Sequence, residues 1–343
     1  LWKGNKQKFK IYRSIIMIIT KTPYRISFFG GGSDYPTWYI KNGGKVLSTT
    51  IDKHIYLTCR FLPNFFNHKF RVVWSKIEQV KNIDKIKHPA VKGLLKYLKI
   101  KKGLEIHYDG DLPAKSGMGS SSSFSVGLLK ALSILNHQEL SKIKLAKKTI
   151  FFEQKIMKET VGSQDQIAAS VGGFNKINFY QNNSFSVNKL PKKNLKSLNS
   201  NLILLYTGIQ RKAHDIAKNY VKKLTYQKER NVYKIMEFVD IGEKLIKNND
   251  LDYFGELMNE AWIEKKMLSK NISNKKIDEL YNFSLGHGAT GGKLLGAGGG
   301  GFLLLYVPYK NRNKLIRKLK KLVQIPFKFS YEGSHGIFNT IRK

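Results

Sequence analysis

Short runs of hydrophobic residues, separated by Gly, Pro and Asn, occupy the first hundred positions of the chain. Branched and aromatic residues dominate these runs, which is typical of strands. They predict strands at 24–30, 45–51, 55–62, 69–74 and 103–113. Beyond residue 119 the apolar residues recur every three or four positions, which predicts helices with one buried face at 120–135 and 141–158.

The second half of the chain begins with strands and continues mainly with helices. Strands are predicted at 174–179 and 202–206, and helices at about 212–248, 251–270 and 274–285. A glycine-rich loop, the strand "FLLLYV", the helix "NRNKLIRKLKKLV" and a last strand "PFKFSYEG" follow. Strands mixed with segregated helices predict an α+β protein.

A polar stretch at 180–201, with Pro191 inside it, is the candidate domain junction because few of its residues could form a core. The chain of 343 residues is long enough for two domains, which we expect at 17–195 and 196–343. Residues 1–16 precede Met17 and the first strand-like segment, and we expect them to be an extension outside the fold.

The formal net charge is +37, from 61 Lys and Arg against 24 Asp and Glu. Basic residues are scattered rather than gathered in one tract, which favours anionic small ligands over nucleic acid, although a nucleic-acid-binding protein stays the alternative class. The single cysteine, Cys59, cannot form an internal disulfide, which suits the reducing cytoplasm. No apolar run is long enough for a membrane span, and the N-terminal one is too short for a signal peptide.

The stretch "DLPAKSGMGSSSSF" places two glycines and four serines where a strand and turn lead into a predicted helix. The first N–H groups of a helix lack internal partners and, with the helix dipole, attract anions. Glycine lets a ligand approach the backbone, and hydroxyls can bind phosphate or Mg²⁺. The stretch therefore predicts a phosphate-binding loop, with a simple N-cap and turn as the alternative.

Two further glycine-rich loops and two acids favour the phosphate interpretation. "TPYRISFFGGGSDY" ends in Asp34, and "GHGATGGKLLGAGGGGF" precedes the apolar strand. Glu153 lies on a predicted helix, and Asp165 follows a Gly-Ser-Gln turn. Phosphoryl transfer needs a metal ligand, cations and a group that orients or deprotonates the attacking hydroxyl, and these acids could supply the first and third. Taken alone, each acid is better explained as a solvated surface carboxylate.

Taken in order, the loops resemble the three motifs of the GHMP kinase superfamily over about residues 20–335. "PYRISFFGGGSDY" is similar to the first motif, "PAKSGMGSSSS" to the second and "GATGGKLLGAGGGGF" to the third. The resemblance implies a two-domain GHMP kinase fold, with an N-terminal ribosomal-protein-like α/β domain and a C-terminal ferredoxin-like α+β domain. It also implies ATP and Mg²⁺ as cofactors.

The resemblance assigns roles to individual positions. Asp165 resembles the catalytic base and Arg25 its partner, which would stabilise the transferring phosphate. Ser121 and Glu153 match the Mg²⁺ ligands. The nucleotide would be bound by the second motif and by a weaker adenine-pocket candidate, namely Trp74, Ser75, Pro113, Lys115, Ser116, Gly117, Met118, Gly119, Ser120, Ser121 and Ser122.

The acceptor is expected to contact the first and third motifs and nearby cations. Asp34 is similar to the residue that binds sugar hydroxyls in sugar kinases. The segment "TGIQRKAHDI" is the candidate for binding the phosphate group of the acceptor. The full predicted set is Gly31, Gly32, Ser33, Asp34, Tyr35, Gly173, Lys176, Tyr206, Arg211, Lys212, Gly298 and Gly299. Arg211 and Lys212 could equally be solvated helix residues.

Departures from the family pattern narrow the choice of acceptor molecules. Galactokinases carry Glu and His where this chain has Gly31 and Gly32, and mevalonate kinases lack "GGGSDYPTWY". That phrase and "GSQDQIAASVGGFN" look most like D-glycero-D-manno-heptose 7-phosphate kinases and related L-fucose kinases, which phosphorylate an anomeric hydroxyl. The prediction is a cytoplasmic sugar 1-kinase on a route to nucleotide-activated heptose for capsule or lipopolysaccharide, with L-fucose as the alternative acceptor. The predicted partner of the enzyme is a small sugar phosphate, and neither nucleic acid nor a membrane is expected as a partner. A homodimer is allowed.

Overall fold

The computed structural model describes residues 17–209, 221 and 223–340. Its larger sheet is built on β1 (Met17–Phe29) and β2 (Gly44–Phe61), which pair antiparallel over most of their length. The strand order is β13 (His335–Asn339), β1, β2, β5 (Leu104–Gly110), β3 (Phe70–Val73) and β4 (Ile77–Val80). Two further strands pair with β2, namely β12 (Phe329–Ser330) and β6 (Phe174–Phe179), and β7 (Phe185–Lys189) pairs with β6. Only the pairing of β3 with β5 is parallel among these ladders.

The strands at 45–51 and 55–62 were predicted separately, but they form the single strand β2 of 18 residues. Asp52 lies in the gap between the two predicted strands and pairs with the C-terminal segment. The Asp52 N–H donates to the Lys328 carbonyl at 2.9 Å, and the Lys328 N–H donates to Asp52 Oδ1 at 2.8 Å. Pairing with a distant segment therefore satisfies the backbone N–H and the carboxylate of Asp52 within a continuous strand. β1 likewise begins at Met17 rather than residue 24.

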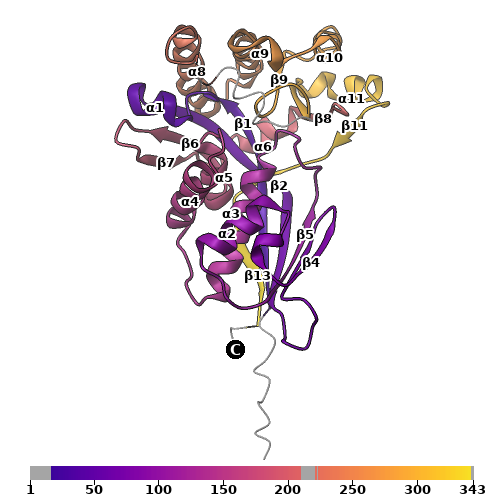
Figure 1. Ribbon diagram of the computed structural model, residues 1–343. Helices are drawn as coiled ribbons and strands as arrows, with labels where there is room; N and C mark the ends of the chain where they lie inside the picture. Colours follow the sequence, from indigo (N-terminus) through magenta and orange to yellow (C-terminus); the bar gives the residue numbers. More distant parts are fainter. Residues whose placement is uncertain (1–16, 210–220, 222, 341–343) are drawn as a thin grey trace, which may run out of the picture.

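Helices α2 (Pro89–Tyr97), α3 (Ser120–Leu135), α4 (Lys142–Phe151) and α5 (Gln164–Val171) lie along one face of the larger sheet (Figure 1). Helix α3 is buried from Ser122 to Leu135, since it packs on β1 and β2 and is itself covered by α4 and α5. The predicted helix 141–158 ends as α4 at Phe151 and continues as one π-helical turn, η2 (Phe152–Ile156). Helices α1 (Pro36–Asn42) and α2 and the 3-10 turn η1 (Ile83–Lys85) lie in a region where only strands were predicted.

The second sheet is antiparallel, in the order β11 (Val323–Ile325), β8 (Leu202–Tyr206), β10 (Phe302–Tyr306) and β9 (Gly291–Leu294). Around it gather α8 (Glu229–Asn248), α9 (Leu251–Leu268), η3 (Lys270–Ile272), α10 (Lys275–Leu285) and α11 (Tyr309–Lys318), at one end of the molecule (Figure 1). Of the helix predicted at 212–248, residues 223–228 form turns and α8 begins at Glu229. Two segregated groups of helices and two sheets confirm the α+β class.

The polar stretch predicted as a domain junction contains β7 and the short helix α6 (Leu195–Ser200). Leu195 and Leu198 of α6 are fully buried and join a hydrophobic core that contains residues of both sheets. After the second sheet the chain returns, and β12 and β13 pair with β2 and β1. Residues 329–339 thus belong to the first sheet by hydrogen bonding, although they follow the predicted boundary at residue 195, which stays a prediction.

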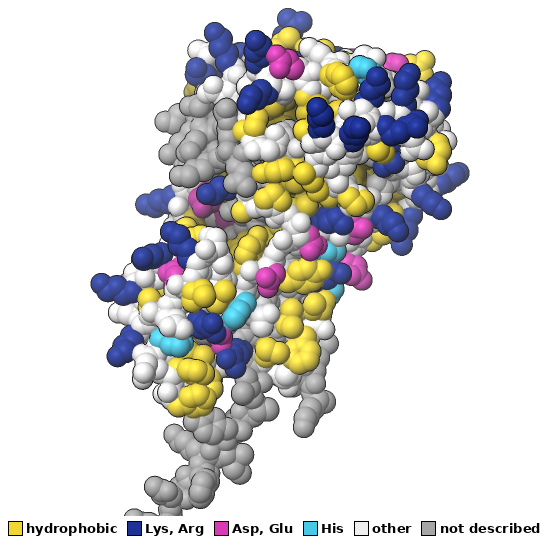
Figure 2. Space-filling model, turned by 90° about the vertical axis from the view of Figure 1, so that its right-hand side faces the viewer, with side chains coloured by type: hydrophobic (Ala, Val, Ile, Leu, Met, Phe, Trp, Pro, Cys, Tyr) yellow, Lys and Arg dark blue, Asp and Glu magenta, His cyan; other side chains and the backbone are white. Residues whose placement is uncertain are grey.

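Lys and Arg side chains are spread over the face shown in Figure 2, interspersed with acidic and hydrophobic residues. Within the described part of the chain, none of the helices is both long enough and apolar enough to cross a membrane.

Candidate functional site

The second glycine loop runs from the end of β5 into α3. Gly117 and Gly119 have φ of +82° and +74°, a left-handed conformation that strains residues with a side chain. A Cβ on Gly117 would lie 2.4 Å from the Leu295 carbonyl oxygen. A Cβ on Gly119 would lie 3.3 Å from both the Arg25 side chain and the Asp165 carboxylate. The two glycines therefore let the loop pass directly between the third loop and the predicted catalytic pair.

Gly119 is the N-cap of α3, a helix of 16 residues, and no side chain caps it. Its first N–H groups are consequently available to an anion at the positive end of the helix dipole. Lys115 and Ser121 are exposed beside this terminus, whereas Ser116, Met118 and Ser122 are buried under it. Pro113 and Ser120 are partly exposed, and Ser120 Oγ accepts a hydrogen bond from the Lys115 N–H at 3.3 Å.

Arg25 on β1 and Asp165 at the start of α5 form a bidentate ion pair. Arg25 Nε donates to Asp165 Oδ1 at 2.7 Å, and Nη2 donates to Oδ2 at 2.8 Å. The remaining Nη1 donates to the Gly117 carbonyl at 2.7 Å, and the Arg25 N–H donates to the Met118 carbonyl at 3.2 Å. The Arg25 side chain is 4% exposed and that of Asp165 is 23% exposed. The arginine thus fixes both the carboxylate and the phosphate-loop backbone while the carboxylate stays open to solvent.

Glu153 lies in the π turn η2 and is almost completely buried. Its Oε2 accepts hydrogen bonds from Ser122 Oγ at 2.8 Å and from Gln166 Nε2. Burial raises the pKa of this carboxyl to about 7, against the opposing effect of its hydrogen bonds. Its other oxygen, Oε1, is buried without a hydrogen-bond partner. Ser122, and not the exposed Ser121 predicted for the metal, is the serine that reaches this carboxylate.

The first loop folds back on itself and buries Asp34. Asp34 Oδ1 accepts from the Gly32 N–H at 3.0 Å, and Oδ2 accepts from the Gln164 N–H at 3.4 Å. The Asp34 carbonyl accepts from the Ser163 N–H at 2.9 Å, so this loop lies against the turn that leads to Asp165. Burial raises the pKa of Asp34, and the negative charge of Asp165 adds to the effect.

The neighbours of Asp34 in the first loop are mostly enclosed. Ser33 Oγ donates to the Gly30 and Lys45 carbonyls at 2.8 and 2.9 Å. Tyr35 is buried and is the N-cap residue of α1, whose first turn contains Pro36. Gly31 is partly exposed, and a Cβ on it would meet nothing closer than 3.8 Å. The loop therefore presents backbone rather than side chains beside Gly31.

The third loop, between β9 and β10, lies against the second. Gly298 packs on Ile272, and the Gly299 N–H donates to the Ile272 carbonyl at 2.8 Å. Two buried lysines that the sequence analysis did not select support this region. Lys265 Nζ donates to the Leu294 and Gly296 carbonyls at 3.1 and 2.5 Å, and Lys293 Nζ donates to the Phe28 carbonyl at 2.6 Å.

An aromatic cluster borders the start of α3. The Trp74 ring lies edge-on to His88, with centroids 4.9 Å apart, and His88 stacks on Phe124 at 4.6 Å. Trp74 Nε1 donates to Glu78 at 2.9 Å, which orients the indole, and burial lowers the pKa of His88. Ser75, the neighbour predicted with Trp74, is exposed. Trp74 is thus connected through His88 to Phe124, which lies on α3 four positions after Ser120.

Among the described residues, the remaining predicted acceptor contacts Lys176, Gly173 and Tyr206 have their recorded partners away from the Arg25–Asp165 pair. Lys176 on β6 is held by Asp240 and Glu243 of α8 at 2.6 and 2.8 Å. Gly173 is bonded to Thr50 of β2, whose hydroxyl accepts its N–H at 2.8 Å. Tyr206 ends β8 and packs on Phe302, beside the third loop. Arg211 and Lys212 lie outside the described residues.

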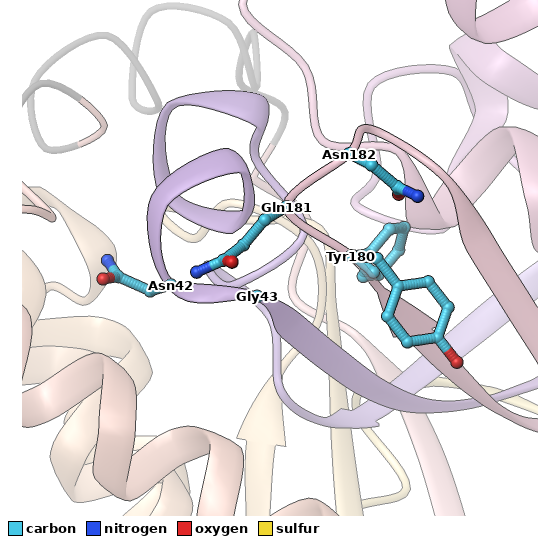
Figure 3. Close-up of a pocket in the computed structure, with 6 residues that line it drawn as sticks. Asn42, Gly43, Tyr180, Gln181 and Asn182 are labelled. Atoms are coloured by element: carbon cyan, nitrogen blue, oxygen red, sulfur yellow. The ribbon is translucent and has the colours of Figure 1, made fainter.

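A surface pocket of about 480 Å³ lies between the end of α1 and the turn that joins β6 and β7. Asn42, Gly43, Phe179, Tyr180, Gln181 and Asn182 line it. Figure 3 shows the Gln181 side chain extended toward Asn42 and the Tyr180 ring turned the other way. The Gln181 amide donates to the Lys41 carbonyl at 2.6 Å. None of the residues predicted for the site lines this pocket.

Two family models match the chain. The model "GHMP kinases N terminal domain" matches residues 84–173, and the model "GHMP kinases C terminal" matches residues 243–324. Their ranges contain the second loop with Asp165 and the third loop, respectively.

Several characterised proteins are similar in sequence or structure. A D-glycero-alpha-D-manno-heptose 7-phosphate kinase of Campylobacter jejuni is 29% identical over 92% of this chain and 97% of its own length. A bifunctional fucokinase/GDP-fucose pyrophosphorylase of Arabidopsis thaliana is 26% identical over 86% of this chain, but over only 30% of its own length. The crystal structure of a D-glycero-D-manno-heptose 1-phosphate kinase from Bacteroides thetaiotaomicron has a TM-score of 0.75 at 23% identity, covering 94% of this chain and 99% of that one. It shares the fold.

Proposed function

The chain belongs to the GHMP kinase family, and we propose that it transfers the terminal phosphoryl group of ATP to the anomeric hydroxyl of D-glycero-D-manno-heptose 7-phosphate. The product would be the 1,7-bisphosphate, on a cytoplasmic route to nucleotide-activated heptose for surface polysaccharide. Similarity along 97% of the Campylobacter heptose 7-phosphate kinase supports this acceptor. Membership of the family, together with the similarity to the heptose 7-phosphate kinase, makes the chain a phosphotransferase that acts on a sugar hydroxyl, and the family uses ATP as donor.

The observation that carries the proposal is the bidentate pair of Arg25 and Asp165 against the phosphate loop. A partly exposed carboxylate can accept the proton of the attacking hydroxyl, while the guanidinium stabilises negative charge on the transferring group. Their mutual hydrogen bonds fix the orientation of both groups before substrate binds. A binding module would have no use for this arrangement.

The nucleotide is proposed to bind along the second loop. The N–H groups at the start of α3 and the open backbone at Gly117 and Gly119 suit the phosphates, as at other helix N-termini. The edge-on Trp74 and the stacked His88 and Phe124 provide apolar surface next to that terminus, which suits a purine ring. We therefore propose that the adenine lies on the Trp74 side of the loop.

Mg²⁺ belongs to the proposal, and the residues present fit it. Glu153 has one buried oxygen with no hydrogen-bond partner, and its neighbour Ser122 supplies a hydroxyl. No cluster of three or more His, Cys, Asp or Glu occurs among the described residues. One carboxylate with phosphate oxygens and water is a common Mg²⁺ environment. Glu153 and Ser122 would hold the ion, which would neutralise charge on the ATP phosphates when bound.

L-Fucose is the second candidate acceptor, favoured by the similarity to the plant fucokinase. The test is ADP release with ATP and Mg²⁺ against D-glycero-D-manno-heptose 7-phosphate, the same heptose without phosphate, L-fucose, D-mannose, galactose and mevalonate. We expect the phosphorylated heptose to give the highest kcat/KM. A higher kcat/KM with L-fucose would make L-fucose the acceptor in place of the heptose. Turnover of mevalonate or galactose alone would overturn the proposal.

A further inference from the structure

Lys265 lies on the buried face of α9, where charged residues are rare. Apolar residues on that face recur at helical spacing, at Phe254, Met258, Ala261 and Leu268, and Lys265 occupies the same stripe with 7% exposure. No ion pair with a carboxylate is recorded for it among the described residues, whereas the next residue, Lys266, pairs with Asp278. Lys265 is thus a buried cation whose partners are neutral.

The partners of Lys265 are two backbone carbonyls of the third loop. Its Nζ donates to Leu294 at 3.1 Å and to Gly296 at 2.5 Å, which fixes the point where β9 ends and the loop begins. Hydrogen bonds from a charged donor are stronger than those between neutral groups. The loop that holds these carbonyls consists mostly of glycine, so few side chains could fix it otherwise.

The part of the loop that Lys265 holds is in direct backbone contact with the phosphate loop. A Cβ on Gly296 would lie 2.6 Å from the Gly117 Cα, so no side chain separates the two loops. The Phe302 N–H donates to the Ser116 carbonyl at 3.2 Å, which is a second contact between them. Gly117 in turn accepts the Arg25 hydrogen bond. A shift of the third loop at Gly296 would therefore move the backbone that holds Arg25.

Burial disfavours the charged form of Lys265. Burial, and after it the charge of Arg25, lower its pKa to about 7, against a smaller opposing effect of Asp34. A buried charge without an ionic partner destabilises a fold, and apolar replacements at such positions are often tolerated. A Leu or Met at this position could not donate hydrogen bonds to the Leu294 and Gly296 carbonyls. These two hydrogen bonds are therefore what the lysine contributes.

We propose that Lys265 is a positioning residue for the phosphoryl transfer, because it fixes the third loop on which the phosphate loop and Arg25 rest. This inference depends on the proposed function only for its kinetic readout. Lys265 touches neither ATP nor acceptor in the proposal, and it acts through Gly296 and Gly117.

The test compares Lys265→Met with Lys266→Met, which removes an ammonium from the adjacent, partly exposed position. ATP affinity is measured by calorimetric titration without acceptor, together with kcat, KM and the thermal midpoint. We expect Lys265→Met to weaken ATP binding and lower kcat, each about tenfold, which corresponds to losing one or two charge-assisted hydrogen bonds. The acceptor KM should change less, and Lys266→Met should stay within about twofold of the wild type.

A purely structural role would lower the thermal midpoint of Lys265→Met and leave the ATP affinity of the folded protein unchanged, which would overturn the proposal. Should Lys265→Met fail to fold, Lys265→Gln keeps one donor for the carbonyls and should give an intermediate ATP affinity. An unchanged affinity in that variant would also overturn the proposal. Because the ATP titration needs no acceptor, an error in the proposed sugar leaves this test intact.

Discussion

The guanidinium of Arg25 holds both carboxylate oxygens of Asp165, although 140 positions separate the two residues. One comes from a central strand and the other from the first turn of a helix that packs on that strand. The third nitrogen of the same guanidinium holds the phosphate loop at Gly117. Donor and acceptor sides of the proposed reaction are therefore aligned by one side chain.

Asp165→Asn tests the proposed base. The amide keeps the size of the side chain but cannot accept the proton, so we expect kcat to fall about 100-fold or more, with ATP affinity changed less than about threefold. Single-turnover rates and ATP titration measure the two effects. Asp278→Asn, a surface carboxylate bound to Lys266, is the control. Unaltered turnover in Asp165→Asn would remove the base assignment.

Glu153→Gln tests the buried carboxylate through the pH dependence of stability. Burial raises the pKa of Glu153 from 4.5 to about 7, so the folded protein keeps a proton that the unfolded chain loses. The wild type should therefore lose stability as pH rises from about 4.5 to 7, by up to about 3 kcal/mol. Glu153→Gln has no such group, and its stability should fall less across that window. Urea unfolding at pH 5 and 8 without Mg²⁺ measures both, and equal changes in the two proteins would contradict the prediction.

Glu153→Gln should also weaken the response to Mg²⁺. If Glu153 and Ser122 hold the ion, the variant needs a higher Mg²⁺ concentration for half-maximal ADP release, by about tenfold, because the amide carries no charge. A surface variant, Glu237→Gln, controls for the general effect of losing a carboxylate. The same Mg²⁺ dependence in Glu153→Gln and the wild type would place the metal elsewhere.

Gly119→Ala tests the close approach of the phosphate loop. An alanine at φ +74° costs about 1 kcal/mol, and its Cβ would press on the Arg25–Asp165 pair at 3.3 Å. We expect kcat to fall about tenfold, by misplacement of the pair. Gly286→Ala is the matched control, because Gly286 has φ −64° and a Cβ there would meet nothing within 3.6 Å. A fully active Gly119→Ala variant would show that the loop has room to move.

Lys176→Met separates two interpretations of a predicted acceptor contact. Lys176 is engaged by Asp240 and Glu243, which join β6 to α8, so the variant should lose stability by about 1 kcal/mol. We expect the KM for the acceptor to stay within about twofold. A large rise in KM for the phosphorylated heptose, but not for the free sugar, would place Lys176 in the acceptor site.

The sequence predicted which residues lie in the candidate site better than it predicted their contacts. Glycine loops and acids are local signals, and the order of three loops identified Arg25 and Asp165 before their contact was known. Which serine meets Glu153 depends on the rotation of α3, where successive residues point about 100° apart. The four consecutive serines give no hint of that rotation. Ser122 is the serine that contacts Glu153, and Ser121 as a metal ligand stays a prediction.

Other features depended on contacts between distant segments. The single strand β2 contains Asp52 and Lys53, which lie between the two predicted strands, and the C-terminal segment hydrogen-bonds to Asp52. Lys265 was overlooked because a lysine in "WIEKKML" is usually solvated. Its spacing from Phe254, Met258 and Ala261 placed it on the apolar stripe, and that periodicity could have identified it.

The pairing of β1 with β13 links the two ends of the described chain. Ile18 pairs with Asn339, and the Met17 N–H donates to Thr340 Oγ1 at 2.8 Å. During synthesis β1 leaves the ribosome long before β13, and the edge of β1 that pairs with β13 is covered only after β13 has emerged. An uncovered edge strand can pair with other chains. Termination before residue 335 would therefore leave this edge of β1 uncovered, and the truncated product would be prone to aggregate through β1.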